Sequence, residues 1–338
     1  MTIRFQKSEV FSQGLAPSDE KRLFQVIEIC GRTAYKSEDK ITDDSAKAFV
    51  LMLKKHGHLS VLEHSNIVLK IEAAAETKGS PAIAVSINDL YELLVKTLRE
   101  RNAYHRIYPL DPLSRGGVAI AANLRSWIET LTYLHDNQEE LHLLFSYWLS
   151  TFYPLLFQGE GSSPPESGFH ASIMPEEEQF ALLHKDPASD LPVFIFKFVC
   201  DRGITHEVVR HRVFSFTQES TRYVNYKNKG MVLILPEEIQ DCYDSLEERF
   251  LDHNPAVDEW LKRAETLFEW YRDDLNRGLR PEIARDILPN LLKSEIFVSG
   301  RWSGWKHFIQ LRDSQHAHPR IRLIAREVRR YFESLNIA

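Results

Sequence analysis

The chain has 338 residues, of which 43% are hydrophobic and 27% charged, and its formal net charge is −6. This is the ordinary balance of a soluble globular protein with one large domain or two smaller ones, and the mild acidity gives no reason to expect bound nucleic acid. No apolar run approaches the roughly 20 residues of a membrane helix, and the first ten residues lack the apolar core of a signal peptide. We therefore expect a cytoplasmic protein without membrane contact. The three cysteines lie far apart, which argues against a disulfide framework.

In chain order, residues 42–57 are predicted to form the first clear helix, with Thr42 as its N-cap and Gly57 as its stop. The segment His64 to Glu72 then alternates between apolar and polar residues, which is typical of a strand. On one face of this strand we expect Ile67, Leu69 and Ile71.

Two further strands are predicted at Val193 to Cys200 and Met231 to Leu235, and residues 158–168 have the composition of a loop. Residues 254–278 show the clearest helical pattern, and the last helix is predicted to start at Pro319. One face of this last helix carries arginines, which we interpret as a solvated charged surface in preference to a ligand site. These are Arg322, Arg326, Arg329 and Arg330.

The predicted strands lie far apart in sequence, with helices between them. This order predicts an α+β fold in which a mixed or antiparallel sheet is flanked by helices. Residues 73–190 separate two segments that we assign below to one site, so we interpret them as a largely helical insertion.

The strongest functional signal is the stretch RHRVFSFTQESTRY, from Arg210 to Tyr223. Arginine keeps its charge in a folded protein and presents a planar fork of donors that fits phosphate and carboxylate oxygens. Three permanent or near-permanent cations, Arg210, His211 and Arg212, precede hydroxyl and amide side chains in a chain of negative net charge. Arg-His-Arg by itself would favour a solvated helix end, so the prediction of an anion site depends on the spacing to Ser220.

Arg-His-Arg followed after seven residues by Ser220, and then by Arg222 and Tyr223, resembles the signature of the flavin-dependent thymidylate synthases. Three other blocks resemble this family in the same order, around Glu63, Arg285 and Arg312. The resemblance implies methylation of dUMP to dTMP, with 5,10-methylenetetrahydrofolate as carbon donor and NADPH as reductant through FAD. It also implies a homotetramer with sites at subunit interfaces. We therefore predict that residues 1–338 form a single catalytic domain of this type, with an insertion at about 73–190.

The resemblance also implies roles for individual residues. Arg312 would be catalytic, because a fixed cation near N3 and the adjacent carbonyl of uracil stabilises negative charge as carbon 5 becomes nucleophilic. Cofactor binding is implied for His58, Ser60, Glu63, Arg210, His211, Arg212, Gln218, Arg301, Ser303, His307 and His316. Substrate binding is implied for Glu207, Arg210, Gln218, Glu219, Ser220, Thr221, Arg222, Arg285 and Arg312, with Arg285 reaching in from another subunit.

Other interpretations of these motifs stay open. Three histidines and Glu63 lie between His56 and His64, but the HExxH pattern is absent, so we predict no metal. Arg285 alone would be read as a helix cation paired with Glu282 or Asp286. The strip Arg301–Trp305 departs from the Asn-Leu-Arg-Glu-Trp of many family members.

Neither a cysteine nucleophile nor a GxGxxG after a strand is found in the sequence, which agrees with a flavin route without a Rossmann site. Three alternative functions remain. They are a flavin-dependent methylase of uracil in RNA, a nucleotide- or nucleic-acid-binding protein that uses the C-terminal arginine face, and a zinc hydrolase.

Overall fold

The computed structural model describes residues 3–73, 86–99, 104–110, 116–157, 168–244, 249–250 and 255–337. The chain divides into two compact units. Unit 1 comprises Met1–Gln13, Cys30–Asp39 and Ile195–Ala338, and unit 2 comprises Gly14–Ile29 and Lys40–Phe194. Each unit has its own sheet, so the α+β prediction is confirmed. That the whole chain acts as one catalytic domain stays a prediction.

Unit 1 is built on a four-stranded sheet with the order β2-β7-β12-β8, in which β12 and β8 pair antiparallel. Two small sheets accompany it, a parallel pair β1-β9 and an antiparallel pair β10-β11. The strands are β1 (Arg4–Gln6), β2 (Glu9–Leu15), β7 (Val193–Asp201), β8 (Ser215–Gln218), β9 (Val232–Ile234), β10 (Tyr243–Asp244), β11 (Arg249–Phe250) and β12 (Lys293–Arg301).

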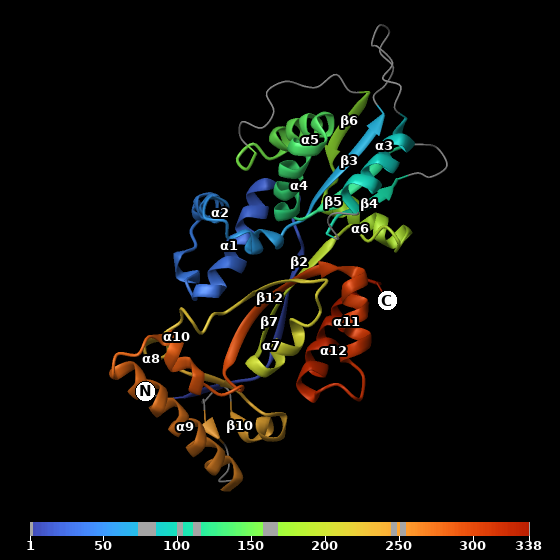
Figure 1. The fold of residues 1–338 in the computed structure, drawn as a ribbon. Helices are drawn as coiled ribbons and strands as arrows, with labels where there is room; N and C mark the ends of the chain where they lie inside the picture. Colours follow the sequence, from blue (N-terminus) through green and yellow to red (C-terminus); the bar gives the residue numbers. More distant parts are fainter. Residues whose placement is uncertain are drawn as a thin grey trace. The chain divides into compact units, whose positions relative to one another are not determined.

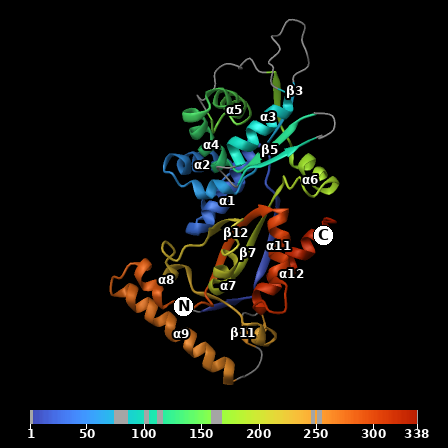
Figure 2. The same ribbon diagram turned by 45° about the vertical axis from the view of Figure 1, so that its right-hand side comes forward.

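Helices flank this sheet, and three of them, α7, α11 and α12, lie along β7 and β12 in both ribbon views (Figures 1 and 2). The helices of unit 1 are α7 (Arg202–Val208), α8 (Tyr226–Lys229), α9 (Pro255–Asn276), α10 (Pro281–Ala284), α11 (Trp302–Arg312) and α12 (Pro319–Ser334). The helices predicted over 254–278 and from Pro319 are thus confirmed.

The central strand β7 presents different side chains to its two faces. Phe196 and Phe198 pack against Trp305 of α11, with ring centroids 4.7 and 6.2 Å apart. Between them Lys197 points to the opposite face, where its Nζ lies 2.5 Å from Glu295 Oε2 on β12. The alternation predicted for Val193 to Cys200 is therefore confirmed, and it separates an apolar helix-covered face from a charged one.

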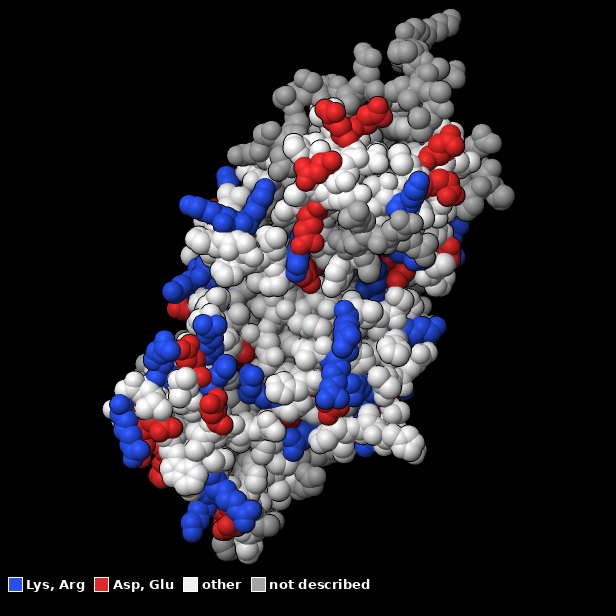
Figure 3. All heavy atoms as spheres, viewed as in Figure 1, with Lys and Arg blue, Asp and Glu red and all other residues white. Residues whose placement is uncertain are grey.

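The last helix, α12, buries its apolar stripe, including Ile321, Ile324 and Val328, and begins with a proline at its first position, where no backbone N–H is needed. On its polar face Arg326 and Arg329 both pair with Asp313, at 3.0 and 2.5 Å. Acidic and basic side chains are interspersed on the face of unit 1 drawn in Figure 3. These pairs support the interpretation of this helix face as a solvated charged surface.

Close packing between β12 and the segment before β8 depends on two glycines. A Cβ at Gly300 would lie 2.2 Å from Phe214 Cδ1, and one at Gly304 would lie 2.8 Å from Phe214 Cε1. Phe214 is buried, with its ring centroid 4.3 Å from that of Trp305. The absence of side chains at these two positions therefore lets Phe214, and with it the Arg210–Arg212 segment, approach α11.

We predict that Gly300→Ala lowers the free energy of unfolding by about 1–3 kcal/mol, because the ring of Phe214 must leave a packed site. The measurement is chemical denaturation of the purified variant beside Lys306→Ala, an exposed position of α11 that should change stability by less than about 0.5 kcal/mol. Equal stability of the two variants would show that Phe214 repacks without cost.

Unit 2 contains an antiparallel sheet with the order β4-β5-β3-β6. Its strands are β3 (Ile67–Ala73), β4 (Arg106–Pro109), β5 (Val118–Ala122) and β6 (Phe169–Ile173). Its helices are α2 (Ser45–Lys55), α3 (Ile87–Leu94), α4 (Leu124–Asn137), α5 (Glu139–Phe152) and α6 (Glu176–Lys185), and α1 (Glu20–Tyr35) begins in unit 2 and ends in unit 1.

Both faces of the unit 2 sheet are buried. Ile67, Leu69 and Ile71 of β3 join the large core formed with the helices, as predicted, whereas Val68 faces a smaller cluster that includes Leu191. The described part of the predicted insertion is largely helical, with α3 to α6, and it also contributes β4 to β6. Most of the loop predicted at 158–168 lies outside the described residues.

One prediction for unit 2 is wrong. The N-cap position of α2 is occupied by Asp44, not Thr42, and the helix begins at Ser45. The reason is local: Ser45 Oγ accepts a hydrogen bond from the Thr42 backbone N–H at 2.9 Å, which closes a turn before the helix starts.

Within the described ranges, no helix is both long and apolar enough to cross a bilayer.

Candidate active site

The helix α7 and the turn that follows it place Glu207 and His211 beside the last turn of α11. The helix starts directly after β7 because the Asp201 side chain caps it, accepting a hydrogen bond from the Ile204 N–H at 2.9 Å. A second bond from Arg320 of α12 to Asp201, at 3.0 Å, ties the cap to the C-terminal helix. This capping role of Asp201 was not part of the sequence prediction, although an aspartate directly before a helix is a recognised signal.

Arg312, the predicted catalytic residue, is held by three hydrogen bonds, and we name Glu207, His211 and Arg312 the Arg312 cluster. Its Nη1 donates to Glu207 Oε2 at 2.9 Å, its Nη2 to the Glu207 carbonyl at 3.1 Å, and its Nε to His211 Nε2 at 2.9 Å. A guanidinium has five N–H donors, so two remain for a ligand, one on each terminal nitrogen. The cluster therefore fixes the guanidinium and leaves two of its N–H groups without a partner among the described residues.

His211 is not the near-permanent cation that the sequence predicted. Burial, with Arg312 and His307 adding positive charge nearby, lowers the pKa of His211 to about 4. At neutral pH the ring is therefore uncharged, and because Nε2 accepts from Arg312, its proton resides on Nδ1. His211 acts here as an acceptor that orients Arg312, and this state depends on burial that the sequence does not show.

The two arginines beside His211 are exposed. Within the described part of the chain, neither Arg210 nor Arg212 makes a side-chain hydrogen bond or ion pair. Their forks of donors are thus open to an anion, which fits the diphosphate of a flavin cofactor.

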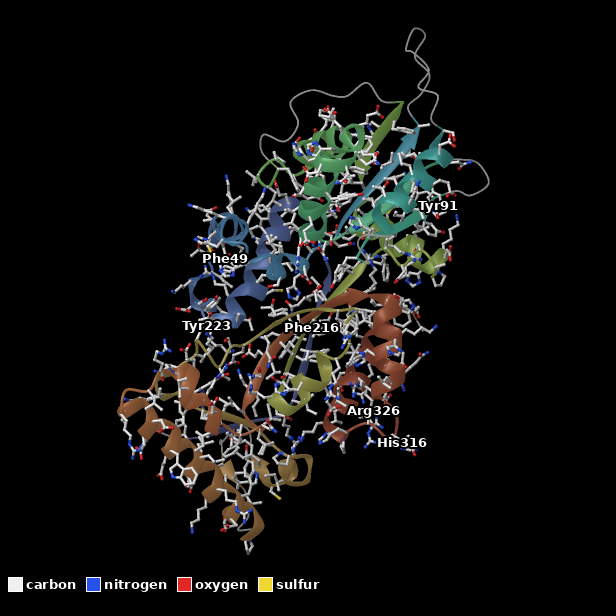
Figure 4. The ribbon with its side chains drawn as sticks, viewed as in Figure 1. Phe49, Tyr91, Phe216, Tyr223, His316 and Arg326 are labelled. Carbon is white, nitrogen blue, oxygen red and sulfur yellow. The ribbon has the colours of Figure 1, made fainter. Side chains whose placement is uncertain are left out.

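Gln218 connects α7 to the sheet. Its Nε2 donates to Thr205 Oγ1 at 2.8 Å and to Ser294 Oγ at 3.0 Å. These bonds place the end of β8 next to the helix that carries Glu207. The loop that follows β8 then turns away, so that Phe216 lies in the sheet and Tyr223 at the end of the loop (Figure 4).

A second group of predicted residues gathers on this loop, and we name Ser220, Thr221, Arg222 and Arg285 the loop cluster. Arg285 Nη1 lies 3.4 Å from Thr221 Oγ1 of the same chain, and the predicted reach of Arg285 into another subunit stays a prediction. The Ser220 hydroxyl accepts a bond from the Arg222 backbone N–H at 3.3 Å. Within the described residues, no hydrogen bond joins the loop cluster to the Arg312 cluster.

Acidic and aromatic neighbours hold the loop cluster in place. Arg222 Nε lies 3.3 Å from Glu282 Oε2, and its guanidinium stands 5.3 Å from the ring centroid of Tyr223. Tyr223 in turn packs on Tyr35 at 4.9 Å. Glu282 was considered in the sequence as a partner of Arg285, whereas the structure pairs it with Arg222.

Glu219 differs from its neighbours because its side chain is buried in unit 1. The Tyr226 hydroxyl donates to Glu219 Oε1 at 2.9 Å, and Nζ of Lys36 and Lys293 lie 3.5 and 3.4 Å from Oε2. The predicted contact of Glu219 with substrate stays a prediction, and the carboxylate has a place in the fold that the sequence did not suggest.

Four predicted cofactor residues lie on α11, at its N-cap or just after it. Arg301 occupies the N-cap position of the helix and Ser303 its first turn. The ring of His307 lies 6.0 Å from that of His211. His316 is exposed in the connection from α11 to α12, near Arg326 in Figure 4.

The remaining predicted cofactor residues, His58, Ser60 and Glu63, belong to unit 2. His58 and Ser60 are exposed, and Glu63 Oε1 lies 2.8 Å from Arg125 Nη1, a partner not predicted from the sequence. Burial lowers the pKa of the neighbouring His64 to about 3, so its ring is uncharged at neutral pH. Within the described ranges no group of three or more His, Cys, Asp or Glu side chains could hold a metal ion.

Comparison with known proteins finds a match for the C-terminal part of the chain. Residues 184–335 match the family model Thy1, described as thymidylate synthase complementing protein. This match confirms the predicted resemblance for the part of the chain that carries both clusters. The stretch from His58 to Glu63 lies outside the matched residues.

Curated relatives agree with this match. The flavin-dependent thymidylate synthase of Pyrococcus abyssi (strain GE5 / Orsay) is 35% identical over 128 residues, which cover 37% of this chain and 48% of the relative. That of Corynebacterium efficiens is 39% identical over 128 residues, covering 37% of this chain and 50% of the relative. The chain thus spans about half the length of the curated relatives it matches.

Among solved structures, the chain is similar to the UMP/dUMP methylase PolB from Streptomyces cacaoi bound with 5-Br UMP. The two are 22% identical with a TM-score of 0.36, over 46% of this chain and 76% of PolB. At this TM-score the likeness supports no conclusion about the present chain.

Proposed function

We propose that this protein is a flavin-dependent thymidylate synthase, which methylates dUMP to dTMP with 5,10-methylenetetrahydrofolate as carbon donor and NADPH as reductant. The observation that carries the proposal is the geometry of Arg312, held by Glu207 and His211 with two donors left for a ligand. The match of residues 184–335 to the Thy1 family supports it.

Arg312 suits the step in which uracil becomes a nucleophile. Carbon 5 of uracil reacts only when negative charge develops on N3 and the adjacent carbonyl, and a fixed cation stabilises that charge where it appears. Because three of its donors are already bonded, Arg312 loses little conformational freedom when it meets the base. Glu207 and His211 are thus positioning residues for Arg312.

The open guanidinium groups of Arg210 and Arg212 are the proposed partners of the FAD phosphates, with Gln218, Arg301, Ser303, His307 and His316 as further proposed cofactor residues. When bound, FAD would supply the redox chemistry of the methylation. His58, Ser60 and Glu63 of unit 2 are proposed flavin contacts as well, on the resemblance alone.

The loop cluster is proposed to bind the nucleotide. Serine and threonine hydroxyls and two arginines form a donor set that fits a phosphate group, and Arg285 lies beside Thr221. We propose that the protein is a homotetramer in which the loop cluster of one subunit completes the site around Arg312 of another.

The proposal is tested by assaying dTMP formation by the purified protein with dUMP, FAD, NADPH and methylenetetrahydrofolate, each omitted in turn. We expect product that requires all four components. Product without methylenetetrahydrofolate would contradict the proposed carbon donor. If neither product nor bound flavin is found, the protein is not a flavin-dependent synthase, and the binding-protein alternative becomes the better one.

A further inference from the structure

The loop after β8, which carries most of the loop cluster, is held by a short segment from a distant part of the chain. This segment consists of Ala34, Tyr35 and Lys36, at the end of α1 and directly after it, and it belongs to unit 1. The sequence predicted no site residue there. Each of the three residues contacts the loop, and we name them the clamp segment.

The first two contacts are a backbone hydrogen bond and an aromatic pair. The Ser220 backbone N–H donates to the Ala34 carbonyl at 3.0 Å. The ring centroid of Tyr35 lies 4.9 Å from that of Tyr223, and both side chains are partly exposed. These two contacts attach both ends of the stretch from Ser220 to Tyr223 to the clamp segment.

The third contact is an ion pair between Lys36 and Glu219. Lys36 Nζ lies 3.5 Å from Glu219 Oε2 and also pairs with Glu295 Oε1 on β12. Glu219 is 2% exposed, and its backbone N–H donates to the Glu295 carbonyl at 2.8 Å. Although burial acts against the charged form, Glu219 and Glu295 raise the pKa of Lys36 above its ordinary value, so the ammonium group is charged at neutral pH. Lys36 thus connects the residue before Ser220 to the central sheet.

The backbone of Lys36 has a conformation that is unusual for a lysine. Its φ is +50°, in the left-handed region. Its N–H donates to the Thr33 carbonyl at 3.3 Å, and the Ser37 N–H donates to the Arg32 carbonyl at 3.2 Å, which is the pattern that ends a helix at a left-handed residue. Glycine is the usual residue at such a position, because a side chain there costs free energy. A lysine in this strained position points to a role for its side chain that glycine could not fill.

Lys197 and Lys293 show what is particular to Lys36. All three lysines pair with Glu295. Lys293 also lies 3.4 Å from Glu219, but it belongs to the same strand as Glu295. Lys197 on β7 contacts Glu295 Oε2 at 2.5 Å, and within the described ranges no ion pair joins it to Glu219. Of the three, Lys36 is therefore the lysine that joins the loop to the end of α1.

We infer that Lys36 is a positioning residue, which acts through Glu219 to hold the loop cluster in the arrangement that binds the nucleotide. The inference rests on the proposed function, in which the loop cluster binds dUMP. A loop that is already ordered loses less conformational freedom when its ligand arrives, so binding is stronger. Lys36 should therefore affect the affinity for dUMP more than the rate of the chemical step.

The test compares Lys36→Met with Lys197→Met. Both changes leave Glu295 with two of its three lysines, so a role limited to stability would make the two variants alike. We expect KM for dUMP to rise about tenfold in Lys36→Met with kcat within about twofold, the pattern of lost binding, and both constants to stay within about twofold in Lys197→Met. Lys36→Arg, which keeps the charge, should restore most of the affinity.

Hydrogen exchange of the loop tests the same inference without the reaction. We expect the amides of residues 219–224 to exchange at least about tenfold faster in Lys36→Met than in the wild type, and at the wild-type rate in Lys197→Met. Equal exchange, or an equal KM for dUMP, in the two variants would overturn the inference. If the wild type forms no dTMP, the proposed function fails, and the exchange comparison decides the role of Lys36 by itself. Should Lys36→Met fail to fold, Lys36→Gly, which suits the left-handed turn, takes its place.

Discussion

An Arg312→Ala protein is expected to lose about 100- to 1,000-fold in the rate of dTMP formation while it keeps its flavin. This is the usual cost of removing one fixed donor that stabilises developing negative charge. We expect Arg312 to stabilise the negative charge on uracil, because Glu207 and His211 hold its guanidinium in place and leave two of its N–H donors unbonded. The measurements are the steady-state rate at saturating dUMP and the absorbance spectrum of bound flavin.

Arg326→Ala is the matched control. Arg326 lies on α12 with a half-exposed side chain paired to Asp313 at 3.0 Å, so its removal should leave turnover unchanged. Arg312→Lys keeps the charge but lacks the planar fork that reaches Glu207 and His211 together, so an intermediate rate is expected. Near-normal turnover of Arg312→Ala would sink the catalytic assignment, provided that thermal denaturation shows the variant to be folded.

Glu295→Gln is expected to lower the free energy of unfolding by about 3–5 kcal/mol, the typical cost of breaking a buried ion pair from one side. The change leaves Lys36, Lys197 and Lys293 around a neutral amide, with Glu219 as the acid that remains beside Lys36 and Lys293. The measurement is equilibrium denaturation near neutral pH. Glu327→Gln is the control, because Glu327 makes an exposed pair with Arg330 on α12 and should change stability by less than about 1 kcal/mol.

The effect of Glu295→Gln should also depend on pH. Despite its burial, the three lysines hold the pKa of Glu295 far below its ordinary value near 4.5. A carboxyl whose pKa is lowered in the folded state stabilises the fold fully above the ordinary value, and this contribution is lost as the pH falls from there toward the folded pKa. The stability difference between wild type and Glu295→Gln should thus be largest above pH 5 and shrink in acid. If the stability difference does not change with pH, the loss of stability in Glu295→Gln comes from packing and not from the lost charge.

Fold class and the main elements could be predicted because they depend on local periodicity. The helix over 254–278, the helix from Pro319 and the alternation from Val193 to Cys200 all follow from residues a few positions apart. The helix start at Thr42 could not be placed, because Thr42 and Ser45 can each close a turn and only the folded backbone shows which one does.

The candidate site was predictable in its residue types more than in its arrangement. The arginines Arg210, Arg212 and Arg312 keep their charge in any environment, and the spacing from Arg-His-Arg to Ser220 turned that charge into the prediction of an anion site. That Arg285 stands beside Thr221 in the same chain, and that Glu282 pairs with Arg222, depends on the packing of α10 against the loop after β8.

By itself the sequence determined the α+β class, the resemblance of residues that lie within 184–335 to the flavin-dependent synthases, and the supply of permanent cations. Only the tertiary structure decided the charge of His211, since its pKa depends on burial and on Arg312 some hundred residues away. It alone also assembled the ion cluster of Lys36, Glu219 and Glu295, whose members come from three separate segments. Periodicity and intrinsic charge are local properties, whereas desolvation and ion pairing arise between segments that meet only in the folded chain.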